Sequence, residues 1–419
     1  MLSEKIYDFM SEPSLWEQQL ERCVQSNKFS SNTFDTIYAQ ISNGTYKTIA
    51  EKIAYGKYKF SVPVKVMLAK PGTNKKRVVY CYTELERFYL SLLYQALETL
   101  FNGKLAINCF AYRRGISVIS AVKSVKRVYD RGEMYGVKID IHAYFNSVSK
   151  EYLYSCIDKL FPANEGIIKT IEQLYKSDKV LWHGEEIEEY KSLIPGCAVS
   201  SLFANYCLAE IDTMFSQLHV PYARYSDDII FFGNTAEERQ KYLDILTKEL
   251  QKRGLELNPN KFEFFDPGDS ITFLGLVMSG DTIDISKHAF EKLKRTIKRY
   301  CKRGRKRMEM QGEPFLKVAC DIMRRWNYNL YRAYVMDMSK YGWGYYAFRY
   351  INTDKTLKAL DIYVKDTIRA MKTGRHNRRN MTAVSDSEWS CMHYLSSVEM
   401  YQLFNASDFE YYCDVVARM

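Results

Sequence analysis

The chain has 419 residues, of which 47% are apolar and 26% are charged, so we expect two or three buried cores, as in an ordinary globular protein. Its formal net charge of +10 suggests an anionic partner. Ten cysteines with no Cys-x-x-Cys pair argue against a zinc finger or a disulfide framework, and we expect reduced thiols in a cytoplasmic protein. The first residues do not resemble a signal peptide, and no apolar run approaches about 18 residues, so no membrane partner is expected.

The N-terminal part of the chain predicts helices followed by a β-hairpin with a cationic tip. The expected elements are, in chain order, helices over 3–55, strands over 60–68 and 77–82 joined by a basic turn at 70–76, and a helix over 83–101. Thr83 and Glu86 support the start of that last helix, because a hydroxyl followed three residues later by a carboxylate is typical of a capping box.

The middle of the chain alternates strand-like and helical segments, which predicts an α+β fold whose sheet has helices on one face. Asp140 lies near the end of the first of these strands, and Asp227 and Asp228 lie at the turn of a strand pair. The other expected elements are a strand over 136–141, helices over 150–160, 167–175, 201–215 and 235–253, a small-residue loop over 194–201, and strands over 262–265 and 271–277.

The C-terminal part is helical and more basic. Ser286 is expected to cap a strongly basic helix over 287–307, in which apolar residues recur at helical spacing. A second basic cluster lies between Arg369 and Arg379. The basic helix over 287–307 could be a solvated charged face, or it could contact an anionic partner.

Three aspartates carry the chemistry that the sequence predicts. Asp140 on one strand can meet Asp227 and Asp228 on another where the two strands are neighbours. Carboxylates suit Mg²⁺, and two such ions about 4 Å apart can activate a 3′-hydroxyl and stabilise a leaving pyrophosphate. An ordinary Asp-Asp turn between strands is the alternative interpretation.

Five motifs in one order resemble the palm of the reverse transcriptases. The segment Tyr225-Ser226-Asp227-Asp228 resembles the Tyr-x-Asp-Asp motif. Five motifs in the order of a family are far more specific than one tetrapeptide. The other four are the Asp-to-aromatic motif at 140–145, the loop-helix motif at 195–205, the fourth palm motif at 254–261 and the primer-grip motif at 273–276.

The resemblance implies a right-hand polymerase with fingers, a palm whose antiparallel sheet carries the Tyr-x-Asp-Asp hairpin, and a helical thumb. The implied domains are an N-terminal helical extension over 1–59, fingers over 60–135 with part of the palm contributed later, a palm over 136–277, and a basic helical thumb with a C-terminal tail over 278–419.

The resemblance also assigns metal ligands. Asp140 and Asp227 would hold both Mg²⁺ ions, for which Mn²⁺ is a substitute, and Asp228 would support the site. The carbonyl of Ile141 would join the ion on the nucleotide side.

Further residues would contact the incoming nucleotide. Phe145 would be the steric gate that disfavours a 2′-hydroxyl, which favours DNA as the product, although a core aromatic is the alternative. Gly196 would let the backbone approach the nucleotide, and Lys261 would protonate or stabilise the pyrophosphate unless it is a surface lysine. The remaining nucleotide residues are Ala143 and Tyr144 beside the gate, and Lys70 and Arg77 at the hairpin, which bind triphosphate or belong to a solvated turn.

The basic helix would follow the backbone of the template–primer duplex, with contacts that depend on salt but not on sequence. The implied partners are an RNA template, a DNA or RNA primer and deoxynucleoside triphosphates, and a homo-oligomer is compatible with the sequence. The implied nucleic-acid contacts are Lys292, Lys294, Arg295, Lys298, Arg299, Lys302 and Arg303.

Two positions depart from the family pattern. Pro195 replaces the usual Gln before the glycine of the loop-helix motif, and Ser201 replaces its Pro. Such departures resemble the abortive-infection and unknown-group bacterial enzymes, so we expect antiphage defence with a dedicated structured non-coding RNA. The alternatives are an RNA-dependent RNA polymerase, a non-catalytic maturase-like RNA-binding protein, and a protein-primed, untemplated DNA polymerase.

Overall fold

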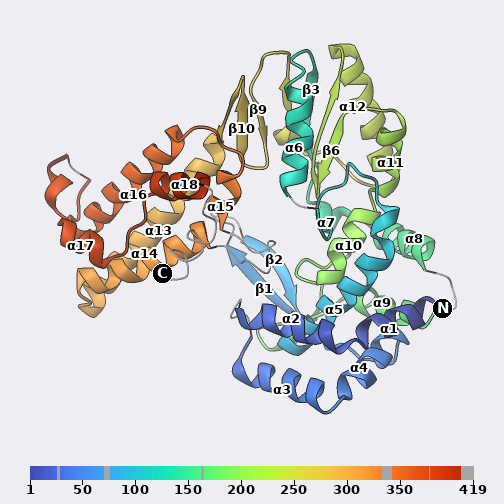
Figure 1. Cartoon of the computed structure of the whole chain (residues 1–419). Coiled ribbons are helices and arrows are strands. Elements are labelled where there is room, and N and C mark those ends of the chain that lie inside the picture. Colours follow the sequence, from blue (N-terminus) through green and yellow to red (C-terminus); the bar gives the residue numbers. More distant parts are fainter. Residues whose placement is uncertain are drawn as a thin grey trace. The chain divides into compact units, whose positions relative to one another are not determined.

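The computed structural model describes residues 1–25, 29–69, 76–116, 118–161, 165–332, 342–376 and 378–406 (Figure 1). The chain divides into two compact units. The first contains Met1–Leu68 and Lys76–Pro267, and the second contains the described chain from Gly268 onward. The predicted α+β composition is confirmed, whereas the fingers, palm and thumb boundaries stay predictions.

The N-terminal helices form a layer around a buried tryptophan. Trp16 is fully buried, and its ring lies within 5.6 Å of the rings of Tyr46, Phe88 and Tyr89. The helical pattern over 3–55 is confirmed. The helices are α1 (Leu2–Met10), α2 (Pro13–Gln25), α3 (Ser31–Ser42), α4 (Thr45–Ala54) and α5 (Glu84–Phe101), which is followed by the short η1 (Asn102–Lys104).

The predicted cap of α5 is also confirmed. The Thr83 hydroxyl accepts a hydrogen bond from the Glu86 N–H at 3.2 Å, and the Glu86 carboxylate accepts one from the Thr83 N–H at 3.2 Å. Two of the unpaired donors at the helix start are thereby satisfied, which is why the helix begins where the pattern placed it.

A four-stranded sheet contains the predicted hairpin. Its strand order is β2-β1-β4-β5, so the two hairpin strands are neighbours, and β4 runs parallel to β1. The hairpin tip lies outside the described residues. The sequence did not predict β4 and β5, because these strands are short and charged and show little hydrophobic periodicity. The strands are β1 (Val64–Ala69), β2 (Lys76–Cys81), β4 (Lys179–Trp182) and β5 (Glu185–Glu188).

A second four-stranded sheet, in the order β6-β7-β3-β8, is antiparallel throughout. Its central strand β7 is almost entirely apolar and buried, as expected for a strand covered on both faces. Helices α6, α11 and α12 contact this sheet (Figure 1). The elements are β3 (Tyr135–Asp140), β6 (Tyr222–Tyr225), β7 (Asp228–Gly233), β8 (Glu263–Phe265), α6 (Val118–Tyr129), α11 (Ala209–Gln217) and α12 (Ala236–Gln251).

The single helix predicted over 201–215 is wrong. Helix α10 (Ala198–Tyr206) ends before α11 begins at Ala209. The N–H of Leu208 turns back to the Asn205 carbonyl, which tightens the last turn of α10. No glycine or proline marks this break in the sequence, so local punctuation could not reveal it.

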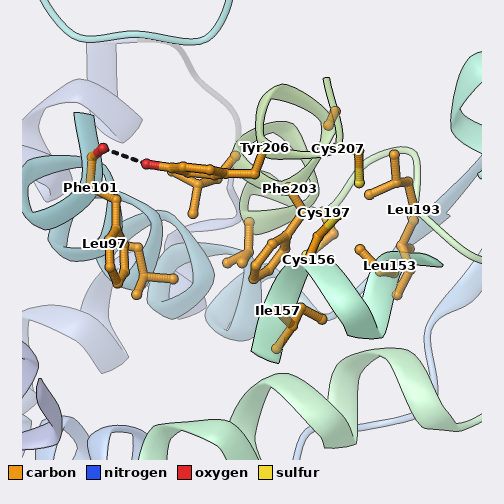
Figure 2. Packing of buried hydrophobic residues seen from close by; sticks show 14 of the residues in the cluster. Leu97, Phe101, Leu153, Cys156, Ile157, Leu193, Cys197, Phe203, Tyr206 and Cys207 are labelled. Carbon is orange, nitrogen blue, oxygen red and sulfur yellow. Dashed lines mark hydrogen bonds between the residues drawn. The ribbon is translucent and has the colours of Figure 1, made fainter. Parts of the chain in front are cut away.

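The main core lies between α5, α8 and α10. Figure 2 shows buried side chains of these helices, among them Phe101, Ile157 and Phe203, and the Tyr206 hydroxyl that donates to the Phe101 carbonyl. Burial of this many apolar side chains stabilises the unit by roughly 25 cal/mol for each Å² removed from water. The neighbouring helices are α7 (Tyr144–Ser147), α8 (Lys150–Leu160) and α9 (Gly166–Lys176), and the short η2 (Pro259–Lys261) precedes β8.

The second unit begins with a three-stranded antiparallel sheet of order β11-β10-β9. The single strand predicted over 271–277 is wrong, because Leu274 and Gly275 have positive φ angles of 49° and 88° and reverse the chain into a hairpin. The strands are β9 (Ile271–Phe273), β10 (Leu276–Ser279) and β11 (Thr282–Ile285).

Helices form the rest of the second unit. The Ser286 hydroxyl accepts from the Ala289 N–H at 3.3 Å, so the predicted cap is confirmed. None of the described helices is long and apolar enough to cross a bilayer. The helices are α13 (Lys287–Gln311), α14 (Phe315–Tyr331), α15 (Trp343–Phe348), α16 (Lys355–Thr373), η3 (Arg378–Thr382), α17 (Asp386–Cys391) and α18 (Ser397–Asn405).

Candidate active site

The register of the second sheet brings the three predicted aspartates together. Asp140, the last residue of β3, lies opposite Asp228, the first residue of β7. Tyr225 of β6 pairs with Asp228, so Ser226 and Asp227 form a two-residue hairpin turn. Ser226 has a φ of 62°, as the first central residue of such a turn often requires. Asp140 therefore lies at the same end of the sheet as Asp227 and Asp228, which follow it in the sequence by 87 and 88 positions.

Negative charge is concentrated at this end of the sheet. Burial and the charge of Asp140 raise the pKa of Asp227. Burial, together with the charges of Asp227 and Asp140, raises the pKa of Asp228 to about 6. Like charges in a poorly solvated site disfavour each other's ionised form, so the group of three carboxylates favours a cation.

A lysine of the chain already contacts one of the three aspartates. The Lys261 ammonium lies 2.8 Å from Oδ1 of Asp140. Asn258 also contacts Asp140, because its N–H donates to the Asp140 carbonyl at 2.8 Å and its side-chain amide lies 3.4 Å from Oδ2. Lys261 and Asn258 thus fix the position of Asp140 from the segment that precedes β8.

The donor atoms suit a hard divalent cation in type. The predicted ligands are oxygen atoms, which Mg²⁺ and Mn²⁺ prefer. Within the described residues, no three His, Cys, Asp or Glu side chains are arranged to hold a metal ion directly. Lys261 takes one of the Asp140 oxygens, so the carboxylates would have to exchange this partner on binding an ion. The assignment of Asp140, Ile141, Asp227 and Asp228 as ligands remains a prediction.

The segment after Asp140 presents one aromatic ring near the surface. Ala143 has a φ of 44° and is the N-cap residue that precedes α7. Tyr144 is buried, and its hydroxyl donates to the Ala204 carbonyl at 2.6 Å, so only its backbone is available to a substrate. Phe145 is half-buried, with its ring edge-on to Tyr144 at 6.0 Å. The predicted steric gate is thus supported from behind by a fixed core aromatic.

The loop before α10 is attached to the other sheet. Gly196 has a φ of 105°, and a Cβ atom there would lie 2.9 Å from the Tyr80 carbonyl oxygen. The Pro195 carbonyl accepts from the Tyr80 N–H at 2.8 Å. Glycine is therefore required by both its conformation and its neighbour. Arg77 is exposed on the same strand β2, and Lys70 lies outside the described residues.

The sequence did not predict the buried ion pair that lies beside the Ser226–Asp227 turn. Arg224 and Asp212 both have 0% exposed side chains and approach to 2.5 Å. The sequence contained one indication of this pair, since a charged residue in the middle of the strand Tyr222–Tyr225 requires a buried partner. Periodicity alone could not identify Asp212 as that partner.

The predicted nucleic-acid residues of α13 divide into two groups. Lys294 is 24% exposed and lies 2.8 Å from Glu291, and the Arg299 guanidinium lies over the Tyr300 ring of its own unit. Five residues share one exposed, basic surface of the helix, which we call the α13 basic face. They are Lys292, Arg295, Lys298, Lys302 and Arg303.

Solved polymerase structures resemble this chain at low sequence identity. Telomerase from Candida tropicalis truncated from its C-terminal domain matches with a TM-score of 0.42 and 13% identity over 54% of this chain, and the match spans 55% of that protein. A longer Candida tropicalis telomerase matches with a TM-score of 0.45 and 12% identity, over 86% of this chain and 69% of that one. Telomerase from Candida albicans, in complex with a fragment of telomeric RNA, matches with a TM-score of 0.43 and 13% identity, over 91% and 70%.

The family itself is shown by sequence. The sequence model of the reverse transcriptase (RNA-dependent DNA polymerase) family matches residues 68–278, which is just over half of the chain. This span contains the three aspartates, Phe145, Gly196 and Lys261. The enzyme class predicted from the motifs is thereby confirmed, and the chain belongs to the reverse transcriptase family.

Proposed function

We propose that this chain is an RNA-directed DNA polymerase whose active site is formed by Asp140, Asp227 and Asp228. The observation that carries the proposal is the pairing of β3 with β7, in which Asp140 lies opposite Asp228. Three carboxylates held at one end of a rigid sheet suit nucleotidyl transfer, because that reaction needs fixed oxygen ligands more than a covalent nucleophile.

The metal ions would supply activation of a primer 3′-hydroxyl and neutralisation of the leaving pyrophosphate, and reverse transcriptases generally use divalent ions. Asp140 and Asp227 would hold the ions, with Asp228 and the Ile141 carbonyl in support. The Lys261 ammonium nitrogen lies 2.8 Å from Oδ1 of Asp140, and from this position it would stabilise or protonate the pyrophosphate.

Other residues would select and orient the nucleotide. Phe145, supported by Tyr144, would exclude a 2′-hydroxyl and so favour deoxynucleotides. The backbone at Ala143, Tyr144 and Gly196 would approach the sugar and base, and Arg77 with Lys70 would bind the triphosphate. The α13 basic face would bind the backbone of the RNA template and the primer.

We further propose that the enzyme acts in bacterial antiphage defence and copies a dedicated structured RNA. The support is the resemblance of Pro195 and Ser201 to the departures found in abortive-infection and unknown-group reverse transcriptases. Sequencing the RNA and DNA that copurify with the chain tests this proposal. We expect one abundant RNA and its cDNA, and the absence of both would contradict the non-coding RNA.

Primer extension on a defined RNA template tests the activity itself. We expect DNA synthesis from deoxynucleotides and its loss in the double variant Asp227→Ala, Asp228→Ala. The matched control is Asp244→Ala, which removes an exposed carboxylate from α12 and should leave synthesis unchanged. Undiminished synthesis by the double variant would overturn the proposal. Preferential use of ribonucleotides would favour an RNA polymerase, and synthesis that ignores the template sequence would favour an untemplated enzyme.

A further inference from the structure

A fully buried arginine lies in the strand that leads into the catalytic turn. The Arg224 side chain is 0% exposed, and its guanidinium contacts Asp212 of α11 through Nε to Oδ1 at 2.8 Å and Nη2 to Oδ2 at 2.5 Å. The Tyr222 hydroxyl donates to the same carboxylate at 2.9 Å. Burial of two charges costs free energy even when they are paired. Stability alone therefore does not explain this ion pair.

One nitrogen of the Arg224 guanidinium, Nη1, also contacts the turn. Its Nη1 donates to the carbonyl oxygen of Ser226 at 3.1 Å and to the side-chain oxygen of Asn205 at 3.2 Å. Ser226 has a φ of 62° and immediately precedes Asp227. The guanidinium therefore connects a core helix to the backbone on which the predicted metal ligands lie. A planar fork with five donors can make these contacts at once, whereas a lysine could not.

A second contact holds the same turn. The Ser226 hydroxyl donates to the Tyr112 hydroxyl at 3.3 Å. Tyr112 belongs to a loop that Arg113 fixes, since Nη1 of Arg113 donates to the carbonyls of Ala106 and Cys109 at 2.7 and 2.8 Å. The Ser226 backbone is thus bound by Arg224, which Asp212 orients, and the Ser226 side chain is bound by Tyr112, whose loop Arg113 fixes.

This loop also pairs with the strand that carries Arg224. The Asn108 carbonyl accepts from the Arg224 N–H, and the Arg224 carbonyl accepts from the Phe110 N–H, each at 2.9 Å. These bonds satisfy the edge of β6, which would otherwise expose unpaired backbone groups. The backbone and the side chain of Arg224 are therefore both fixed. A residue that orients a reactive turn must itself have a fixed position.

We propose that Arg224, oriented by Asp212, is a positioning residue that holds the Ser226–Asp227–Asp228 turn in the geometry needed to bind divalent metal ions. The inference rests on the proposed function, because it assigns Arg224 to the same site. The physical reason is that Asp227 and Asp228 repel each other and Asp140. Without the hydrogen bond from Arg224 to the Ser226 carbonyl, this repulsion would move the turn away from Asp140. The carboxylates would then no longer be preorganised for a metal ion.

The test separates positioning from stability. Arg224→Met alone would leave Asp212 as an unpaired buried charge and could unfold the protein. The double variant Arg224→Met, Asp212→Asn removes both charges and keeps an acceptor for the Tyr222 hydroxyl, so its melting temperature should return close to that of the wild type. Tyr112→Phe is a milder second variant, which removes only the hydroxyl contact with Ser226.

Two measurements use no substrate. We expect amide hydrogen exchange of the metal-free protein to become about tenfold faster over residues 225–228 in the double variant, and the dissociation constant for Mn²⁺ alone, measured by calorimetry, to rise about tenfold. Tyr112→Phe should move both quantities in the same direction by about threefold. The matched control is Arg253→Met, which breaks the ion pairs with Glu249 and Glu210 and should change neither quantity.

The outcomes distinguish the two proposals. If both Arg224 and Tyr112 variants fold and keep the exchange rate and the Mn²⁺ affinity of the wild type, Arg224 is only structural and the inference is overturned. If instead the Asp227→Ala, Asp228→Ala variant still makes DNA, the proposed function fails, while faster exchange in the Arg224 variant would still show that Arg224 orders the turn.

Discussion

The turn at Ser226 and Asp227 and the α13 basic face differ in how firmly their charges are held. At the turn, Asp228 is paired by register with Asp140, and the Ser226 carbonyl accepts from a buried arginine. The α13 basic face, in contrast, is exposed at the surface. The less exposed Lys294 of the same helix is paired with Glu291. Reaction chemistry needs fixed geometry, whereas binding to a phosphate backbone tolerates mobile side chains.

The two regions also concentrate charge of opposite sign. The turn gathers carboxylates in a partly buried place, where burial and the charges of Asp227 and Asp140 raise the pKa of Asp228 to about 6. The α13 basic face gathers cations in water, where salt screens their repulsion. We therefore expect changes at the turn to act on chemistry and stability, and changes on α13 to act on binding and on its salt dependence.

Asp140→Asn should have the largest effect. The amide keeps the size of the side chain but loses a charged oxygen ligand, so we expect primer extension to fall about a thousandfold or more while the fold is retained. Steady-state kinetics and a circular dichroism melt check the two parts. The control Asp158→Asn changes a carboxylate of α8 outside the site, and comparable losses in both variants would place the chemistry elsewhere.

Asp228→Asn should stabilise the metal-free protein. The folded-state pKa of Asp228 is raised to about 6, so the ionised side chain costs stability at pH 7.5, by as much as about 3 kcal/mol. Urea unfolding in a chelator should show that gain at pH 7.5. The gain should shrink as the pH falls through 6 and should vanish below about 3, where the carboxyl is protonated in both the folded and the unfolded state. A variant less stable than the wild type at pH 7.5 would contradict the predicted cost of the ionised Asp228 side chain.

Phe145→Ala tests the steric gate. Removal of the ring should let a ribose 2′-hydroxyl enter, and we expect the preference for deoxynucleotides over ribonucleotides, measured as a ratio of kcat/KM values, to fall about tenfold to a hundredfold. Phe145→Tyr is the matched control and should keep the preference. Equal selectivity in the alanine variant would make Phe145 a core residue only.

Substitutions on the α13 basic face should have the smallest effect on the reaction. We expect Lys298→Gln, Lys302→Gln and Arg303→Gln together to weaken duplex binding about tenfold and to lower the slope of log affinity against log salt by about 2 to 3, with kcat unchanged. Lys294→Gln is the control, because that ammonium is already paired with Glu291. An unchanged salt slope in the triple variant would mean that another surface binds the duplex.

Much of the local structure was predictable. The capping box of α5, the strand that ends at Asp140 and the helix capped by Ser286 follow from rules that involve residues close in sequence. The same rules failed in two segments. Between 201 and 215 a tightened turn separates two helices, and between 271 and 277 the positive φ angles of Leu274 and Gly275 separate two strands. At these places packing overrides local preference.

The sequence by itself determined the family and which residue types occupy the candidate site, because the motifs keep their order and spacing along the chain. Only the tertiary structure decided that Asp140 lies opposite Asp228, that Arg224 has Asp212 as its partner, and that Lys294 faces its own unit. The physical reason is that the free energy of a charge depends on its distance to other charges and to water. Strand register and helix orientation set those distances, and both are fixed by burial over the whole fold.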